Sequence, residues 1–242
     1  MIAFSALLSK IIVGTVAVLG TVRCGFGLYG WRIAETLEKP VYTVIQRLPG
    51  GVELRQYEPY LIAETTVDGV GFREPTSSGF RACAGYIFGK NKPGKGMVDG
   101  EKMAMTAPVR VSGRSPPAGE KMAMTAPVRV NGGGKKKTKV SFVIGSKYTI
   151  KSVPKPVDRN VSIKQVPRHV LATKKFSGPP PSDDRVETER RKIEDSLEAA
   201  GLKSADDETL VYGYHDPFIT PNFLRRNEVA VYVDAKSVAA LQ

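Results

Sequence analysis

Alternating apolar and polar residues predict β-strands along most of the chain after residue 40. Residues 41–47 and 52–57 flank the turn Pro49-Gly50-Gly51, and the alternation of the second segment indicates a β-hairpin. Residues 60–67 predict a third strand. Further segments rich in strand-forming residues lie at residues 103–111, 122–130, 140–144, 148–153, 161–166, 169–176, 210–214 and 229–233. Because proline lacks the N–H that a ladder needs, Pro108 and Pro127 limit two of these segments to edges, bulges or strand ends.

Two segments follow the helical period instead. The first apolar stripe consists of Phe80, Cys83, Ala84 and Ile87, with Gly89 placed to end the helix. The second follows a run of three prolines and consists of Val186, Ile193, Leu197 and Ala200, with Gly201 at its end. Asp184 followed by Glu187 predicts a capping box at its start. The order strands, helix, strands, helix, strands, with about nine strands, predicts an α+β fold with two similar halves around a curved sheet.

The N-terminal segment differs from the rest, because residues 2–31 contain only the charges of Lys10 and Arg23. The uncharged run 11–22 would span about 18 Å as a helix, short of a hydrocarbon core of about 30 Å. Extending the run to Trp31 reaches the required length but includes Arg23, which must reach the interface. We expect residues 1–38 to be an apolar helix that acts as a membrane anchor, a cleaved signal segment or an organellar presequence. Residues 39–242 then form one domain, in a compartment that these patterns do not identify.

Composition narrows the class of protein. The chain has 242 residues, of which 41% are hydrophobic and 25% charged, as is usual for a globular protein. The net charge of +12 raises the question of nucleic acid binding. The basic cluster at 135–139 follows three glycines and has no interleaved aromatic residues, so we expect a solvated loop there and no nucleic acid site. The excess charge suits an anionic ligand or an anionic membrane surface.

One twelve-residue stretch occurs twice, letter for letter. GEKMAMTAPVRV covers residues 100–111 and returns at 119–130. The motifs that accompany it run in order along the chain: GVELRQYEPY at 51–60, GYIFGKN at 85–91, MTAPV at 105–109 and again at 124–128, Phe176-Ser177-Gly178, Asp216-Pro217 and RRNEV at 225–229. With these motifs the chain resembles the SOUL haem-binding proteins, and it is similar also to the p22 haem-binding protein. The resemblance spans about residues 41–234.

The resemblance implies a distorted antiparallel β-barrel flanked by two helices, which agrees with the strand and helix count. It also implies binding of haem or a related porphyrin on an apolar surface around Phe80, Ala84 and Ile87. That surface would face the MTAPV segments, with Met105 and Met124, and the loop before RRNEV. The same three side chains are also the ones expected to pack in an ordinary helix core.

Three further residues are candidates for the porphyrin site. His215 lies in a loop near the expected surface and is the candidate metal ligand, through a ring nitrogen to iron. Members of the family commonly have asparagine or tyrosine near this position, so the resemblance does not supply this role. Arg225 or Arg226 is placed to bind a propionate, since guanidinium matches a carboxylate with two hydrogen bonds. A bond within the protein, to Glu228 or to backbone, is the alternative.

No catalytic centre is recognisable, because the sequence has no GxSxG, HExxH or Cys-His motif. We therefore expect a binding protein, tethered to a membrane through its N-terminal segment, that buffers, carries or presents a tetrapyrrole. One alternative is an accessory interaction subunit of a membrane complex without pigment. The other is a barrel enzyme acting on a small hydrophobic substrate, with acid–base side chains that leave no linear motif.

Overall fold

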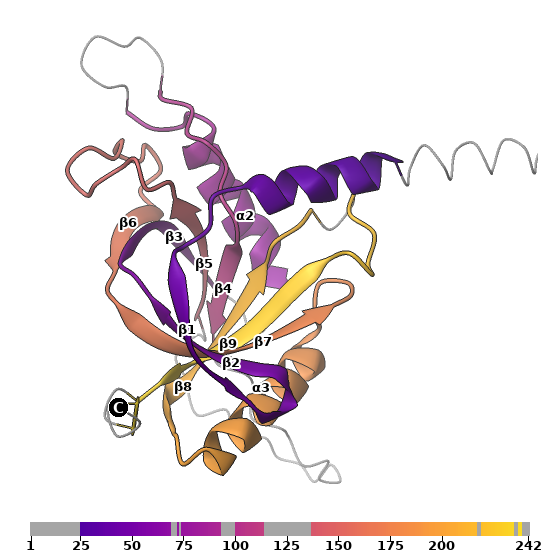
Figure 1. The fold of residues 1–242 in the computed structure, drawn as a ribbon. Coiled ribbons are helices and arrows are strands. Elements are labelled where there is room, and N and C mark those ends of the chain that lie inside the picture. The colour runs from indigo at the N-terminus through magenta and orange to yellow at the C-terminus, as the bar shows by residue number, and fades with distance from the viewer. Residues whose placement is uncertain are drawn as a thin grey trace, which may run out of the picture.

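The computed structural model describes residues 25–68, 72, 74–92, 100–113, 137–216, 219–234 and 237–238. Its centre is one antiparallel sheet of nine strands (Figure 1). The strands are β1 (Tyr42–Leu48), β2 (Val52–Tyr57), β3 (Tyr60–Asp68), β4 (Val109–Gly113), β5 (Lys137–Ile144), β6 (Val161–Val166), β7 (His169–Ser177), β8 (Ser204–Gly213) and β9 (Arg226–Val233). The helices are α2 (Glu74–Ile87), α3 (Asp183–Ala199) and an N-terminal helix whose described part covers residues 25–36.

The strand order shows two halves of the same construction. The order across the sheet is β1-β2-β7-β9-β8-β4-β5-β3-β6. Each half runs strand, helix, strand, strand along the chain: β3-α2-β4-β5 in one and β7-α3-β8-β9 in the other. The halves meet where β4 pairs with β8. The nine strands and the repeated arrangement agree with the sequence-based prediction.

The prediction of a barrel was wrong, because the sheet is not closed. β1 and β6 form its two edges, and each pairs with a single neighbour. Closure requires strand number, stagger and tilt to match around the whole ring. The two-residue alternation of the sequence reports only which face a side chain is on, so it carries no information on closure.

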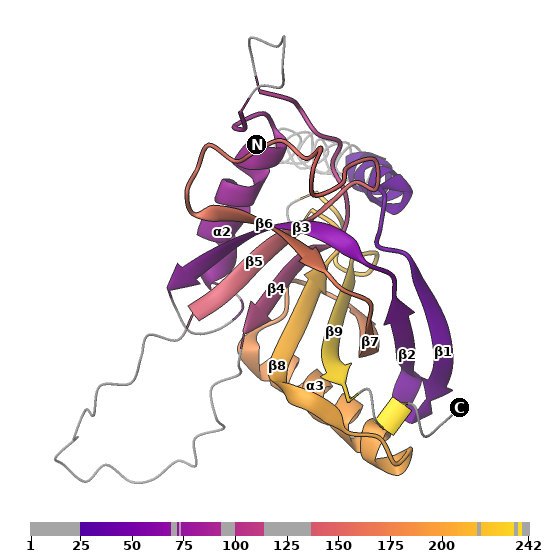
Figure 2. The ribbon, with the colours of Figure 1, turned by 90° about the vertical axis from the view of Figure 1, so that its left-hand side faces the viewer.

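Both α2 and α3 pack on the same face of the sheet, over different halves (Figure 2). Helix α3 buries Val186, Ile193 and Leu197 against a cluster that includes Leu54 and Val229. The opposite face is curled inward. One cavity on that inner face is lined by residues from β2, β3 and β8, although these strands are far apart in the strand order. The helices thus close one side of the sheet and leave the other to form the interior of the curl.

Helix α2 packs over the other half. Cys83, Tyr86 and Ile87 lie in a cluster with residues of β3 and β5, and the Cys83 side chain is fully buried. Gly79 lies directly on β5, where a side chain would meet Val140. Close contact between the helix and the sheet is therefore possible only because this position has no Cβ.

Three local predictions differ from the structure. Residues 148–153 form turns instead of a strand, because Thr149 and Ser152 bond to each other and the Val153 N–H donates to the Thr149 carbonyl (2.9 Å). The strand expected at 103–111 begins only at Val109. The N-cap of α3 is Ser182, whose Oγ accepts from the Arg185 N–H (3.4 Å), so the capping box at Asp184 was wrong. The segment 122–130 lies outside the described residues.

The N-terminal helix packs against the loop that precedes β9. A Cβ placed on Gly27 would lie 2.8 Å from Pro221 Cδ, and one on Gly30 would lie 3.2 Å from Ile219. The absence of side chains at these two positions brings the helix close to the loop. In the described residues, no helix combines the length and the apolar character needed to cross a membrane. Residues 1–24 of the expected anchor lie outside the described part of the chain.

Candidate functional site

An open groove of about 650 Å³ lies between the N-terminal helix, the end of β7 and the loop before β9. We call it the helix–loop groove. Its lining residues are Trp31, Glu35, Lys175, Phe176, Ser177, Phe223, Leu224, Arg225 and Arg226. The volume is in the range of small-molecule sites, which is about 300–1,000 Å³. Three aromatic rings and three cationic side chains share this lining, so the groove suits a flat apolar ligand that carries negative charge.

The cations of the groove differ in their surroundings. Lys175 is exposed and forms no ion pair with any described residue. The Arg225 guanidinium donates to the Thr220 carbonyl oxygen (2.7 Å), and burial lowers the pKa of Arg225. The Phe223 side chain beside them is 77% exposed, although phenylalanine gains by leaving water. A ligand that covers Phe223 would therefore also meet positive charge.

Arg226 is held in the groove by a buried carboxylate. Glu228 is fully buried and accepts from Arg226 Nη2 (2.6 Å), from Arg55 Nη1 (3.0 Å) and from the Tyr214 hydroxyl (2.6 Å). The Arg226 guanidinium also lies 4.1 Å from the centre of the Tyr214 ring. One carboxylate thus holds two arginines, of which Arg226 lines the groove.

His215 joins the groove to the N-terminal helix. Its Nδ1 accepts from the Arg226 backbone N–H (3.0 Å), which leaves the proton on Nε2, the atom that donates to Glu35 Oε1 (3.1 Å). Burial of the ring lowers the pKa of His215, opposed by the Glu35 carboxylate. Both ring nitrogens are used in hydrogen bonds, so ligation of iron would require breaking the bond to Glu35. No group of three or more His, Cys, Asp and Glu side chains in the described ranges could hold a metal ion.

The segment from residue 37 to residue 232, which includes most of the described structure, matches a known protein family. The family model described as "SOUL heme-binding protein" matches residues 37–232. The chain belongs to the SOUL haem-binding protein family. This family membership confirms the resemblance seen in the sequence, and it makes haem the first ligand to consider. A search of curated proteins found no match.

Solved structures share the SOUL fold at low sequence identity. A hydrolase from Listeria innocua has 9% identity and a TM-score of 0.51, over 76% of this chain and 91% of that one. The C-terminal domain of EcmrR has 11% identity and a TM-score of 0.45, over 80% of this chain and 98% of that one. At 9% identity the likeness to the Listeria innocua hydrolase shows the fold alone.

In this SOUL protein the residues expected around α2 are only partly accessible. Ala84 and Ile87 are 9% and 3% exposed and belong to the core between α2 and the sheet. Phe80 is 40% exposed, with its ring 5.1 Å from that of Phe142. Met105 is 41% exposed, and Met124 lies outside the described residues. The role of this surface stays a prediction.

The groove brings together two of the expected residues with several that the sequence did not indicate. Arg225 and Arg226 line it, whereas Phe80, Ala84, Ile87 and Met105 do not. Both arginines also make the bonds within the protein that were the alternative, Arg225 to backbone and Arg226 to Glu228. Trp31 was expected only as the end of the N-terminal apolar run, and Phe223 lies in a loop without periodicity. The position of this loop just before RRNEV could have indicated Phe223, because the resemblance places that loop beside the ligand. No signal in the sequence indicates Trp31.

Proposed function

We propose that this SOUL protein binds haem or a related porphyrin in the helix–loop groove. The observation that carries the proposal is the lining itself: Trp31, Phe176 and Phe223 offer ring faces and edges, and cations lie next to them. A flat macrocycle gains by covering aromatic surface, and its propionates need positive partners. Lys175 and Arg225 are the side chains placed to bind these propionates.

Titration of the full chain with hemin, followed by the Soret band, tests the site. Phe223→Ala should weaken binding at least about tenfold, because burial of a phenylalanine side chain contributes about 1.5–3 kcal/mol. The matched control is Phe80→Ala on α2, which should leave the dissociation constant unchanged. The two variants therefore distinguish binding in the groove from binding on the α2 surface that the sequence predicts.

Other results would redirect the proposal. A loss of affinity in Phe80→Ala, with Phe223→Ala unaffected, would move the ligand to α2. The absence of saturable binding by the natural chain would contradict tetrapyrrole binding and favour an accessory subunit. Chemical conversion of the bound ligand would favour the enzyme alternative.

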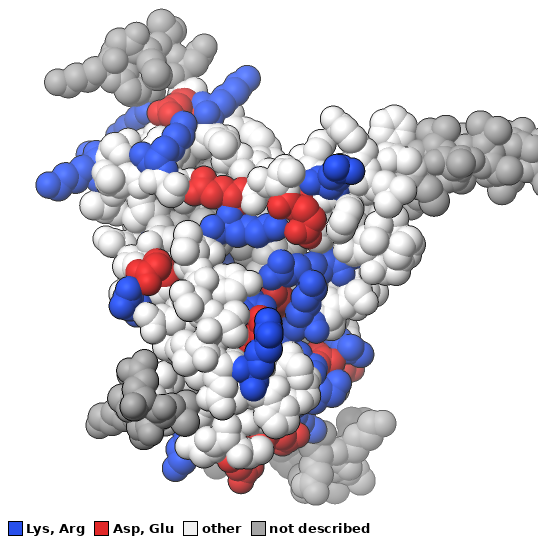
Figure 3. Space-filling view, in the orientation of Figure 1, with Lys and Arg blue, Asp and Glu red and all other residues white. Residues whose placement is uncertain are grey.

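We also propose that this end of the molecule faces a membrane. Of the twelve large apolar side chains that are exposed in the described ranges, six lie here: Phe26, Leu28, Tyr29, Ile33, Ile219 and Phe223. The region formed by the N-terminal helix and the loop below it is largely free of charged residues in Figure 3. The rest of that face carries interspersed positive and negative charges. Exposed apolar area of this kind suits an interface with lipid, and the net positive charge of the chain favours a membrane that contains anionic lipids.

Co-sedimentation of the full chain with phosphatidylglycerol vesicles tests the membrane proposal. We expect the chain to pellet with the vesicles. Phe26→Ser should reduce the bound fraction, because this side chain is 66% exposed at the expected interface. Phe88→Ser is the control, since Phe88 is 55% exposed on another part of the surface. A natural chain that stays in the supernatant would contradict the proposal, as would equal effects of the two substitutions.

A further inference from the structure

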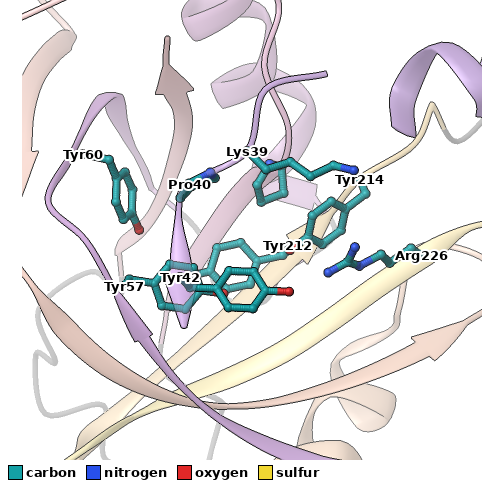
Figure 4. A pocket seen from close by; sticks show the side chains of 9 residues that line it. Lys39, Pro40, Tyr42, Tyr57, Tyr60, Tyr212, Tyr214 and Arg226 are labelled. Carbon is teal, nitrogen blue, oxygen red and sulfur yellow. The ribbon is translucent and has the colours of Figure 1, made fainter. Parts of the chain in front are cut away.

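The inner face of the curled sheet contains a second, smaller cavity of about 40 Å³ (Figure 4). We call it the tyrosine cavity. Its lining residues are Lys39, Pro40, Tyr42, Tyr57, Tyr60, Pro108, Tyr212, Tyr214 and Arg226. The two cations of this lining already have carboxylate partners: Lys39 pairs with Glu35 (3.0 Å) and Arg226 with Glu228 (2.6 Å). The cavity therefore has aromatic walls and compensated charges at its lining.

Behind the tyrosines lies a buried cation without such a partner. Arg110 on β4 is 6% exposed, and within the described ranges no carboxylate lies within 4.0 Å of it. Its Nη2 donates to the Tyr232 hydroxyl (2.9 Å), and its Nε has no hydrogen-bond partner among these residues. A buried ion without a counter-charge strongly destabilises a folded protein.

The cross-strand partners of Arg110 are neutral. Tyr212 is its direct partner across β8, and Ser141 is its partner across β5. Burial raises the pKa of Tyr212 and Tyr232 and lowers the pKa of His169, which keeps all three uncharged near pH 7. Glu208, at the far end of β8, forms an ion pair with Lys139 (3.7 Å). Glu208 is the one negatively charged group among these; it contributes, against burial, to the raised pKa of Arg110, but from more than 4.0 Å away, so Arg110 has no carboxylate in contact with it within the described ranges.

More polar atoms on the same face lack partners among the described residues. They are Tyr212 Oη, Ser112 Oγ, Thr173 Oγ1 and His169 Nε2. Buried polar groups in native proteins are nearly always hydrogen-bonded to protein, to ordered water or to a ligand. Tyr212 is the side chain that connects the two observations, because it lines the cavity and also neighbours Arg110. The concentration of unsatisfied polar atoms points to a polar occupant of this interior.

We propose that the tyrosine cavity binds a small carboxylate. A water molecule needs roughly 10–15 Å³ by this measure of volume, so the cavity holds about three heavy atoms, the size of a carboxylate group. The Tyr212 hydroxyl donates to the anion, and the charge of Arg110 behind it compensates the negative charge. The carboxylate belongs either to a free small acid or to one arm of a larger ligand in the helix–loop groove, which shares Arg226 with this cavity. The proposal does not depend on haem binding.

Titration of the full chain with ¹³C-labelled formate, followed by NMR, tests the site. We expect saturable binding by the natural chain. Arg110→Met should weaken it at least about tenfold, because the anion then loses the positive charge that compensates it in the protein interior. Tyr212→Phe keeps the ring and removes only the hydroxyl, and it should weaken formate binding about threefold or more. Arg47→Met is the control, since Arg47 is 80% exposed on β1.

The outcomes separate the possibilities. Arg110→Met removes an uncompensated charge and should remain folded, as circular dichroism would show. If this variant does not fold, the formate affinity of Tyr212→Phe tests the proposal. The proposal is overturned if the natural chain shows no saturable binding, or if Tyr212→Phe binds formate as tightly as the natural chain does. A repeat titration in the presence of hemin identifies the source. Displacement of formate by hemin supports an arm of the groove ligand, and an unchanged formate affinity supports a free acid.

Discussion

Replacing Glu228 by glutamine should lower the free energy of unfolding by about 3–5 kcal/mol, the usual effect of removing one partner from a buried ion pair. The carboxylate is fully buried and neutralises both Arg55 and Arg226, while it accepts from the Tyr214 hydroxyl. Glutamine has nearly the same shape but leaves the Arg226 guanidinium without its carboxylate partner, and it leaves Arg55 with only Glu53 (2.7 Å). Urea denaturation measures the change.

The control is Glu58→Gln. Glu58 also forms a short ion pair, with Arg168 (2.7 Å), but both side chains are largely exposed. Exposed pairs contribute at most about 1 kcal/mol, so this variant should remain close to the natural chain. If the two variants lost equal stability, the buried network would not have the role in the fold that its geometry indicates.

Replacing Gly79 by alanine should also destabilise the protein, although alanine is the better helix former. A Cβ at this position would lie 2.5 Å from Val140 Cγ2 and 2.6 Å from Val140 Cβ, within the contact between α2 and β5. Overpacking of a core costs about 1–3 kcal/mol. The gain in helix propensity is about 1 kcal/mol, so we expect a net loss of up to about 2 kcal/mol in thermal or chemical denaturation.

Gly85→Ala, in the same helix, is the matched control. Its Cβ would lie 3.2 Å from Lys90 Cδ, and this flexible side chain can move aside. Here the helix propensity acts alone, and stability should rise by up to about 1 kcal/mol. A gain in stability for Gly79→Ala would mean that α2 does not pack on β5 as closely as described.

Much of the fold could be predicted because local sequence and tertiary structure agree in most segments. The hairpin around Pro49 forms as expected, with Gly50 and Gly51 both at positive φ (70° and 74°). Helix α3 buries the expected stripe, and Gly201 follows it at a φ of 71°. The prediction failed at residues 148–153, where strand-forming residues have no neighbouring strand to pair with. There the hydroxyls of Thr149 and Ser152 bond within a turn instead.

The candidate site was less predictable, because its residues come from distant parts of the chain. The motifs correctly led to the family, since they are contiguous stretches of sequence. Arg225, which they also indicated, lines the groove, and its role stays a prediction. The bond between His215 and Glu35 joins residues 180 positions apart, and that between Arg110 and Tyr232 joins residues 122 apart. No local pattern indicates that these side chains meet. The sequence therefore pointed to α2, whereas the structure shows a groove beside the N-terminal helix.

The amino-acid order alone determined the family, the number of strands, the positions of α2 and α3, and which side chains alternate to which face of the sheet. These properties depend on neighbours within a few residues or on contiguous motifs. Only the folded chain decided that the sheet stays open, that one of its faces curls inward over tyrosines and a buried arginine, and that the helix before β1 forms a wall of the groove. Sheet curvature and the positions of docked loops arise from packing over the whole molecule. They are therefore determined jointly by residues that are far apart in the sequence.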